Sequence, residues 1–464
     1  MLNRRRFLSH SCTLGAAGAP GATLGGSLLQ LGLAQRVAAQ TGDDYRALVC
    51  ILLAGGNDSY NMLVPTDADQ YSEYAAIRSD LALPRESLLQ LDGVTAAGRR
   101  YGLHPGMADA QQLFADGDLG VLCNVGTLLE PVDAQKVESG SVETPLGLFS
   151  HSDQIAQWQT AVSDQRVAQG WAGRTADLFE GGDPANGISM NISLSGNNLF
   201  QSGFSSVEYS VNATGDGAIG LNGYGESGPV GEFRTNVVDA LLSPAPTHIL
   251  RREYSKRLRQ AVDAQQFFVS AIQQAPMLST GFSDGGLSQS LRQIARIIGA
   301  RDTFAARRQT FFITVGGWDH HDDVLDNQAA MLPPVSLALR EFRDALVELG
   351  VLDRVTTFTI SDFGRTLTSN GKGSDHGWGG HHLVMGGSVR GGQFYGDYPE
   401  ISPVSPLDVG RGIYAPTTAV GEYFAELALW FGVAESDLAT VLPNVRNFVS
   451  TGAETAPLGM MTPL

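Results

Sequence analysis

Residues 310–323 read TFFITVGGWDHHDD, and this stretch decides the fold. The apolar run Thr310–Val315 predicts a buried strand, which two glycines and a cluster of acids and histidines follow directly. A helix is expected next, begun by Pro333-Pro334 and ended by Gly350. Its apolar residues recur at the helical period: Val335, Leu339, Phe342, Leu346 and Leu349. Since Val355–Ile360 then predicts another strand, the segment is expected to form a β-α-β unit.

Two earlier apolar runs extend the predicted sheet. Ala47–Ala54 and Leu119–Val125 are continuous apolar runs, which suit strands covered on both faces in a parallel or mixed α/β sheet. Helices are expected over Met107–Asp116, from Ser150, and again from about residue 245. Residues 181–231 are rich in Gly, Asn and Ser with short alternating stretches, which indicates a small β-rich insertion or cap. By length, 464 residues could form one large α/β domain or two to three smaller ones.

The N-terminus has the order basic, apolar, small that is typical of an export signal. Arg4, Arg5, Phe7 and Leu8 fit the twin-arginine pattern, and Val37 and Ala39 occupy positions −3 and −1 of a cleavage site before Gln40. We therefore expect residues 1–39 to be a twin-arginine signal peptide and residues 40–464, the mature chain, to form a single domain with the insertion or cap at about 181–231. The expected location is the periplasm or the exterior of the cell.

The net charge limits the kinds of binding partner that we expect, and the cysteine positions limit the possible disulfides. The formal net charge is −17, and removal of a signal with four arginines and no acids gives −21, which disfavours nucleic acid and anionic membrane. No later run of about 18 apolar residues is present, so no membrane insertion is expected. Cys50 and Cys123 each lie in an apolar run, which favours two buried thiols; a disulfide would need the two strands to be neighbours.

Acids and histidines follow three predicted strands, and ligands of open α/β sheets bind at such strand ends. Five of the nine histidines lie between positions 320 and 382. Imidazole and carboxylate are the usual ligands of zinc and manganese, so we expect one or two divalent ions. The expected ligands are Asp58, Asp319, His321, Asp362 and His376, with His320, Asp375 and His381 as further candidates.

Two residues are candidates for catalysis. Ser150, or its neighbour Ser152, lies at an expected helix N-terminus, where amide groups and the helix dipole favour anions. Arg365 could hold an anion with two parallel hydrogen bonds. The alternatives are an ordinary N-cap serine and a solvated arginine. The one G-x-S-x-G match, GFSDG at 281–285, lies between two expected helices and not after a predicted strand, so a metal-free serine hydrolase is disfavoured.

Five segments together resemble a large uncharacterised family of bacterial exported proteins allied to the alkaline phosphatase/sulfatase superfamily. They are LLAGGNDSYNMLVP, LFSHSDQIAQWQ with GWAGR, GGWDHH, SDFGRT and SDHGWGGHHLVMGG, in this order, and the resemblance spans residues 45–448. It implies an alkaline phosphatase-like α/β fold, with a mixed central β-sheet flanked by helices on both faces and a two-metal site at the strand ends.

The resemblance also implies individual roles. Asp58 resembles the first-strand acid of the second metal, Asp319, His321 and His376 resemble ligands of the first, and Ser150 falls near the nucleophile. Asp362 resembles the acid of an Asp-His pair, but Phe363 stands where the histidine is expected.

The expected activity is hydrolysis of small anionic phosphate or sulfate esters. In this interpretation Ser150 attacks, activated by a cation at Asp58 and Asp362. A second cation, at Asp319, His321 and His376, stabilises the leaving or non-bridging oxygen, and Arg365 helps to orient it. The alternative is a secreted metal-binding protein without enzymatic activity, whose insertion at 181–231 binds glycan or another surface component.

Overall fold

The structure is a computed structural model. It describes residues 45–464 except 94, 96–97, 181–186, 243–247, 403, 451–455 and 463–464. The expected signal peptide, residues 1–39, lies outside the described residues.

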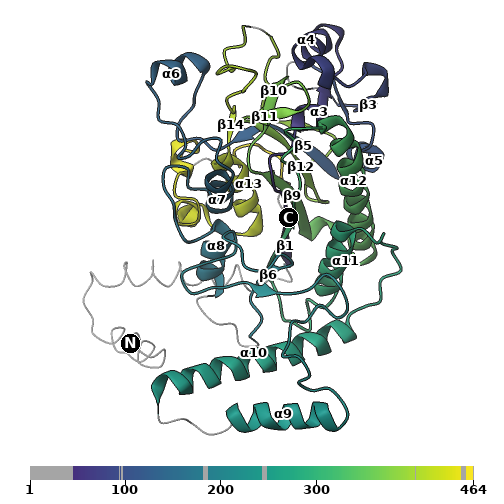
Figure 1. The fold of residues 1–464 in the computed structure, drawn as a ribbon, viewed down its shortest axis with the longest axis vertical. Helices are drawn as coiled ribbons and strands as arrows, with labels where there is room; N and C mark the ends of the chain where they lie inside the picture. The colour runs from purple at the N-terminus through teal and green to yellow at the C-terminus, as the bar shows by residue number, and fades with distance from the viewer. Residues whose placement is uncertain are drawn as a thin grey trace, which may run out of the picture. The chain divides into compact units, whose positions relative to one another are not determined.

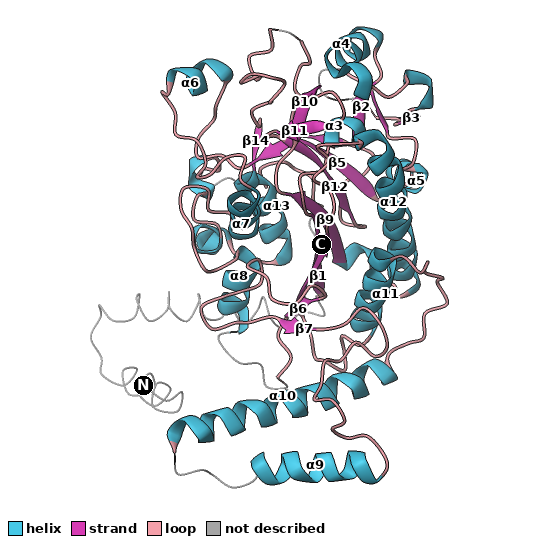
Figure 2. Cartoon of the chain, in the orientation of Figure 1, coloured by secondary structure: helices cyan, strands magenta, loops and turns pink. Residues whose placement is uncertain are grey.

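A nine-stranded mixed sheet forms the centre of the fold, with the strand order β13-β5-β12-β9-β1-β8-β6-β7 and β14 paired to β5 (Figures 1 and 2). Its strands are β1 (Arg46–Leu53), β5 (Leu119–Gly126), β6 (Asn191–Ser193), β7 (Tyr209–Ser210), β8 (Arg308–Val315), β9 (Val355–Ser361), β12 (Gly380–Met385), β13 (Phe394–Tyr395) and β14 (Thr418–Ala419). Two small sheets flank it: β2 (Leu63–Pro65), β3 (Leu89–Gln90) and β4 (Tyr101–Leu103) form one, and β10 (Arg365–Ser369) and β11 (Ser374–His376) form the other.

The pairing places several strand ends at one edge of the sheet. β1 runs parallel to β8 on one side and to β9 on the other, with Leu53 opposite both Val315 and Ser361. β12 is antiparallel to both β9 and β5. The carboxyl ends of β1, β5, β8 and β9 therefore lie at the same edge, together with the start of β12.

Helices cover both faces of this sheet (Figure 1). Alternate residues of β1 belong to two separate cores, as the two-residue period of a strand requires. One core includes α5 (Ala108–Ala115), α10 (Ile249–Gln274), α11 (Gly286–Gly299) and α12 (Val324–Glu348). The other includes α7 (His151–Thr160), α8 (Trp171–Glu180), α13 (Val420–Phe431) and α14 (Leu438–Val441). The remaining α-helices are α3 (Ser59–Met62), α4 (Ala68–Arg78), α6 (Ala134–Ser139) and α9 (Pro229–Leu242).

The predicted fold class, an α/β protein with a mixed central sheet between helices, is confirmed. The predicted strands over residues 47–54, 119–125, 310–315 and 355–360 correspond to β1, β5, β8 and β9. Cys50 and Cys123 are free buried thiols, and their strands are not neighbours because β12 and β9 lie between them.

Two expectations differ from the structure. The prolines at 333 and 334 do not begin a helix, because α12 starts at Val324 and contains both. A helix tolerates them here since the carbonyls four residues earlier belong to Ala329 and Ala330, which are exposed and can bond to water. The described part of the segment 181–231, residues 187–231, is not β-rich: its strands are β6 and β7, of three and two residues, and both extend the edge of the central sheet.

Candidate metal centre

Side chains from several elements meet at the edge where β1, β8 and β9 end. Asp319 follows β8, Asp362 follows β9, His376 ends β11, and His151 begins α7, the helix that comes after β5. The turn after β1 passes close to the turn after β8, and Gly55 has a φ of +122°. A β-carbon at Gly55 would lie 2.5 Å from the backbone nitrogen of Asp319, so this close approach requires glycine.

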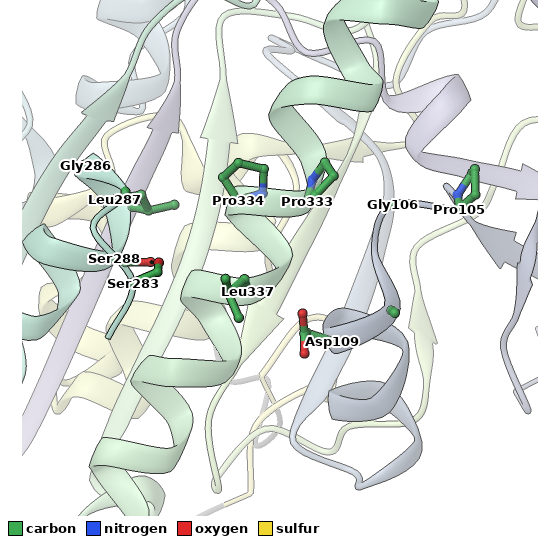
Figure 3. A pocket seen from close by; sticks show the side chains of 12 residues that line it. Pro105, Gly106, Asp109, Ser283, Gly286, Leu287, Ser288, Pro333, Pro334 and Leu337 are labelled. Atoms are coloured by element: carbon green, nitrogen blue, oxygen red, sulfur yellow. Dashed lines mark hydrogen bonds between the residues drawn. The ribbon is translucent and has the colours of Figure 1, made fainter. Parts of the chain in front are cut away.

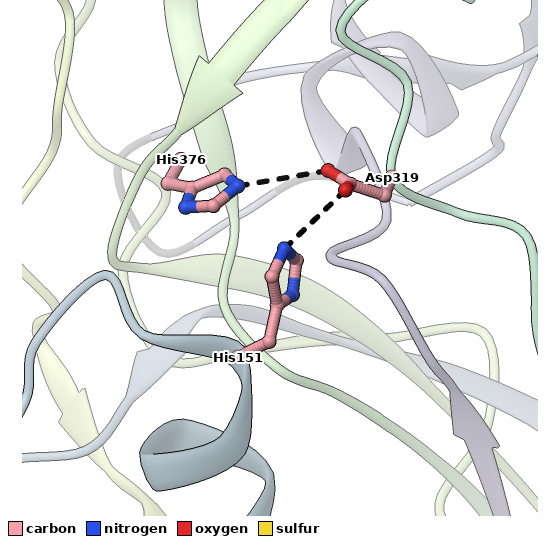
Figure 4. Close-up of side chains that lie close together, drawn as sticks. All are labelled: His151, Asp319 and His376. Carbon is pink, nitrogen blue, oxygen red and sulfur yellow. Dashed lines mark ion pairs between the residues drawn. The ribbon is translucent and has the colours of Figure 1, made fainter.

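His151, Asp319 and His376 form the centre of the cluster (Figure 4). One donor atom from each of the three lies within 4.8 Å of the others. The Nε2 atom of His151 is 3.5 Å from Asp319 Oδ2, and that of His376 is 3.6 Å from Asp319 Oδ1. The side chains are 25% to 48% exposed, so the cluster is open to solvent on one side.

His321 adds a fourth donor. Its Nε2 atom lies 3.1 Å from Asp319 Oδ1 and 3.0 Å from the Nε2 atom of His376. Two neutral imidazole nitrogens this close repel each other through their lone pairs unless a proton or a cation lies between them. The arrangement is therefore suited to a shared cation.

The outer nitrogen of each ring has an oxygen partner. His376 Nδ1 lies 2.8 Å from the carbonyl of Phe149, His151 Nδ1 lies 2.6 Å from Asp362 Oδ2, and His321 Nδ1 lies 3.3 Å from Asp375 Oδ1. An oxygen at Nδ1 places the proton there and leaves the Nε2 lone pair free. Histidines that bind metals are usually held in this way. The buried Nε2 atom of His151 has no hydrogen-bond partner in the structure.

Asp319 is kept ionised by Arg365. Burial raises the pKa of the Asp319 carboxyl, but the hydrogen bond and positive charge of Arg365 outweigh it, so the pKa lies below its ordinary value. Burial lowers the pKa of His376, so this imidazole stays neutral near pH 7. A carboxylate beside imidazole nitrogens is a suitable ligand set for zinc.

Arg365 is not positioned as the anion clamp that the sequence led us to expect. Its side chain is fully buried and donates to Gly56 O at 2.9 Å, to Ser374 O at 2.9 Å, to Gly55 O and to Asp319. These acceptors occupy its donors, so Arg365 holds the strand ends and Asp319 in place.

Asp58 does not join the cluster either. It forms a fully buried ion pair with Arg78 of α4 and accepts a hydrogen bond of 2.6 Å from Ser374. Arg78 also donates to Asn61 Oδ1 at 3.0 Å and to Thr366 O at 2.9 Å. Arg78 and Ser374 both bind Asp58 Oδ2, while the buried Oδ1 atom has no hydrogen-bond partner among the described residues, so a second metal would have to share this carboxylate with the Arg78 guanidinium.

Asp362 supports the cluster instead of binding at its centre. Its Oδ1 atom accepts the backbone N–H of Gly55 at 3.0 Å, while Oδ2 holds His151. Phe363, the residue in place of the expected histidine, packs against the rings of His151 and His376, with centroids 4.9 and 4.6 Å away. His151, which comes from the start of α7, faces Asp319 instead, with its Nε2 atom 3.5 Å from Asp319 Oδ2.

The three further candidates have different surroundings. Asp375 orients His321 and also binds Asn370 and Arg411. His381 accepts the backbone N–H of Asn124 at 3.1 Å and stacks on Tyr398, with centroids 4.5 Å apart. His320 is buried and is not among the donors around Asp319.

Sequence reasoning missed His151. It lies inside the quoted motif LFSHSDQ, between the two serines that drew attention as nucleophiles. The available signal was a histidine at the first position of a helix that follows a strand of the sheet. Ser150 is the N-cap residue of α7, its side chain makes no capping bond, and its Oγ atom lies 3.2 Å from Ser152 Oγ.

A separate groove of about 410 Å³ lies between the starts of α5 and α11 and the proline turn of α12 (Figure 3). Pro333, Pro334 and Leu337 line one side, and Ser283, Ser288 and Asp109 supply polar groups. None of the residues predicted from the sequence for the site lines this groove.

The fold and the cluster together define a class: an α/β protein with a histidine- and carboxylate-lined site at the carboxyl ends of its central strands. Residues 247–437 match the family model described as "Protein of unknown function (DUF1501)". The comparison with curated proteins found no match for this chain. Among the described residues, no helix has the length and apolar character needed to cross a bilayer.

Three solved structures resemble the chain weakly. PsFucS1 sulfatase from Pseudoalteromonas sp. is 10% identical, with a TM-score of 0.34 over 94% of this chain and 77% of that chain. Ps i-CgsB is 9% identical, with a TM-score of 0.33 over 87% and 77%. The lipoteichoic acid synthase LtaP from Listeria monocytogenes is 7% identical, with a TM-score of 0.31 over 80% and 76%. Similarity at this level carries no argument about activity.

Proposed function

We propose that this chain is an exported metal-dependent hydrolase of phosphate or sulfate esters, with one divalent ion held by His151, Asp319, His321 and His376. One observation carries the proposal. Three imidazole Nε2 atoms surround one carboxylate, while each Nδ1 atom is held by an oxygen. Export rests on the twin-arginine pattern at Arg4 and Arg5.

The ligand set favours zinc and a single ion. Three imidazole nitrogens and one carboxylate oxygen match the preferences of zinc in proteins. A bound zinc ion supplies positive charge to an ester oxygen and lowers the pKa of a hydroxyl or water that it contacts. The acids expected to bind a second ion are engaged elsewhere, Asp58 with Arg78 and Asp362 with Gly55 and His151.

The start of α7 provides the groups for an anionic substrate. His151, Ser152 and Asp153 form its first turn, where backbone N–H groups have no partner within the helix. Such groups and the helix dipole attract a phosphate or sulfate group. Ser150 and Ser152 flank His151 in the sequence, so each hydroxyl belongs to a residue adjacent to a proposed metal ligand at the start of α7.

Metal analysis of the purified protein and assays on aryl phosphate and aryl sulfate esters test this function. We expect about one zinc ion per chain and turnover of one ester class. Ser150→Ala should abolish turnover and retain the metal, whereas Ser152→Ala should retain both. Stoichiometric metal without turnover on any ester would favour the alternative of a metal-binding protein without enzymatic activity.

A further inference from the structure

The helical hairpin of α9 (Pro229–Leu242) and α10 (Ile249–Gln274) exposes an unusual set of side chains. On α9 the apolar residues Val230, Phe233, Val237 and Leu241 are 65%, 67%, 40% and 72% exposed. Their spacing of three, four and four residues places them on one face of the helix. This face forms an exposed apolar stripe.

The opposite side of α9 holds it to α10. Asp239 forms an ion pair of 2.7 Å with Arg259 of α10 and accepts a hydrogen bond of 2.9 Å from Tyr224. Asp239 lies half a turn away from the apolar stripe, nine residues after Val230. The helix therefore turns its polar side toward the protein and its apolar side outward, the reverse of an ordinary surface helix.

The apolar face of α10 is half covered. Phe268 and Ile272, in its C-terminal half, are buried in the core. Leu250 and Tyr254 lie 18 residues, or five helical turns, before them on the same face and are 71% and 69% exposed. This exposed side of α10 is not part of the apolar stripe of α9. Arg259, which pairs with Asp239 of α9, lies nine residues after Leu250 and so half a turn away from it, and Leu250 and Tyr254 therefore face away from α9.

The hairpin also differs in charge from the rest of the chain. Residues 229–274 contain six of the 31 Lys and Arg residues but four of the 48 Asp and Glu residues, a net charge of +2 in a chain of −17. Arg252 and Lys256 lie four residues apart on α10 and are exposed. An amphipathic segment with aromatic and aliphatic side chains beside basic ones is typical of binding in the plane of a lipid surface.

A second copy of the chain is a poorer partner for this face. Two hairpins packed stripe to stripe would bring equal positive charges together, which opposes association. An anionic lipid surface attracts those charges and accepts the apolar stripe. In Figure 1, α9 and α10 lie at the bottom and β10 and β11 near the top, so the acidic body and the strand-end cluster would face away from the lipid.

We propose that the α9–α10 hairpin docks this protein on anionic lipid surfaces, with the apolar stripe in the interface and Arg252 and Lys256 at the headgroups. This inference does not depend on the proposed hydrolase activity. It concerns binding at the surface of a bilayer and not insertion across it.

Sedimentation with vesicles tests the proposal. The full chain is mixed with vesicles of phosphatidylcholine alone or with phosphatidylglycerol at one third of the lipid. We expect at least tenfold stronger binding to the anionic vesicles, weakened by salt. Both Phe233→Glu/Leu241→Glu and Arg252→Glu/Lys256→Glu should reduce it at least tenfold. Residues 1–44 are common to all variants, so their contribution cancels.

Met277→Glu is the matched control, because Met277 is 94% exposed and lies after the far end of α10. It should bind like the parent. Equal binding by all variants, or no binding of the parent, would overturn the proposal. Light scattering could instead show that the parent is a dimer, that Phe233→Glu/Leu241→Glu makes it a monomer, and that vesicles do not change the dimer. This result would overturn the proposal in favour of a second copy of the chain as the partner.

Discussion

The Nε2 atoms of His321 and His376 face each other at 3.0 Å, although His321 lies in the loop after β8 and His376 ends β11, 55 residues later. Each ring is fixed by an oxygen at its other nitrogen, Asp375 for His321 and Phe149 for His376. Where no proton lies between them, the two imidazole lone pairs repel each other, and a cation bound between them would remove this cost.

Removal of one of these rings should therefore remove the metal. We expect His376→Ala and His151→Ala to contain less than a tenth of the parent's metal after dialysis, measured by elemental analysis. His248→Ala, which alters an exposed histidine at the start of α10, should retain the full content. Metal bound equally by all three variants would place the ion elsewhere.

Chelation should destabilise the folded state, because an ion that binds only the native chain stabilises it by mass action. At a free metal concentration a thousandfold above Kd, the contribution is about 4 kcal/mol. We expect EDTA to lower the Tm of the parent and to leave the Tm of His376→Ala unchanged. Equal shifts in both proteins would mean that the chelator acts at another site.

Asp362 should influence metal affinity without touching the metal. In Asp362→Asn the partner of His151 Nδ1 loses its charge, so this imidazole becomes a weaker and less fixed donor. Loss of such a partner usually weakens metal binding about 10- to 100-fold. A competition titration with a chromophoric chelator measures this, and Asp322→Asn, an exposed change beside the cluster, should bind like the parent.

The sequence predicted the framework of this site better than its details. Continuous apolar runs identified the strands that end beside Asp319 and Asp362, because a strand buried on both faces of a sheet consists almost entirely of apolar residues. The role of Asp58 could not be predicted, since its partner Arg78 lies on α4 and nothing in its local sequence indicates full burial. His151 escaped because a single histidine between serines has no periodic or paired signal.

Asp58 provides a stability test that separates structural and metal roles. Asp58→Asn leaves Arg78 buried without its counter-ion, which typically costs about 3–5 kcal/mol in the free energy of unfolding. Denaturant unfolding should show this loss, while the metal content stays at the parental level. Asp69→Asn is the control, since its partner Arg99 is exposed and such pairs contribute at most about 1 kcal/mol. A loss of metal in Asp58→Asn would restore Asp58 as a ligand.

His381 should make the fold sensitive to acid. Burial lowers the pKa of this imidazole to about 3, below the value of about 6.5 expected in the unfolded chain. Its Nδ1 atom accepts a hydrogen bond from the backbone N–H of Asn124, so protonation of Nδ1 would place two N–H donors face to face. Between pH 6.5 and 3 the unfolded chain binds more protons at this position, and stability therefore falls as the pH is lowered through that range.

The contribution of one such group reaches about 1.4 kcal/mol per pH unit. We measure the free energy of unfolding in urea at pH 7, 6, 5 and 4 for the parent and for His381→Gln. We expect the value for the variant to decrease by about 1.4 kcal/mol less per pH unit than the value for the parent. His382, whose pKa burial also lowers to about 3, should leave part of the slope in place. Parallel curves for parent and variant would mean that His381 does not titrate on unfolding.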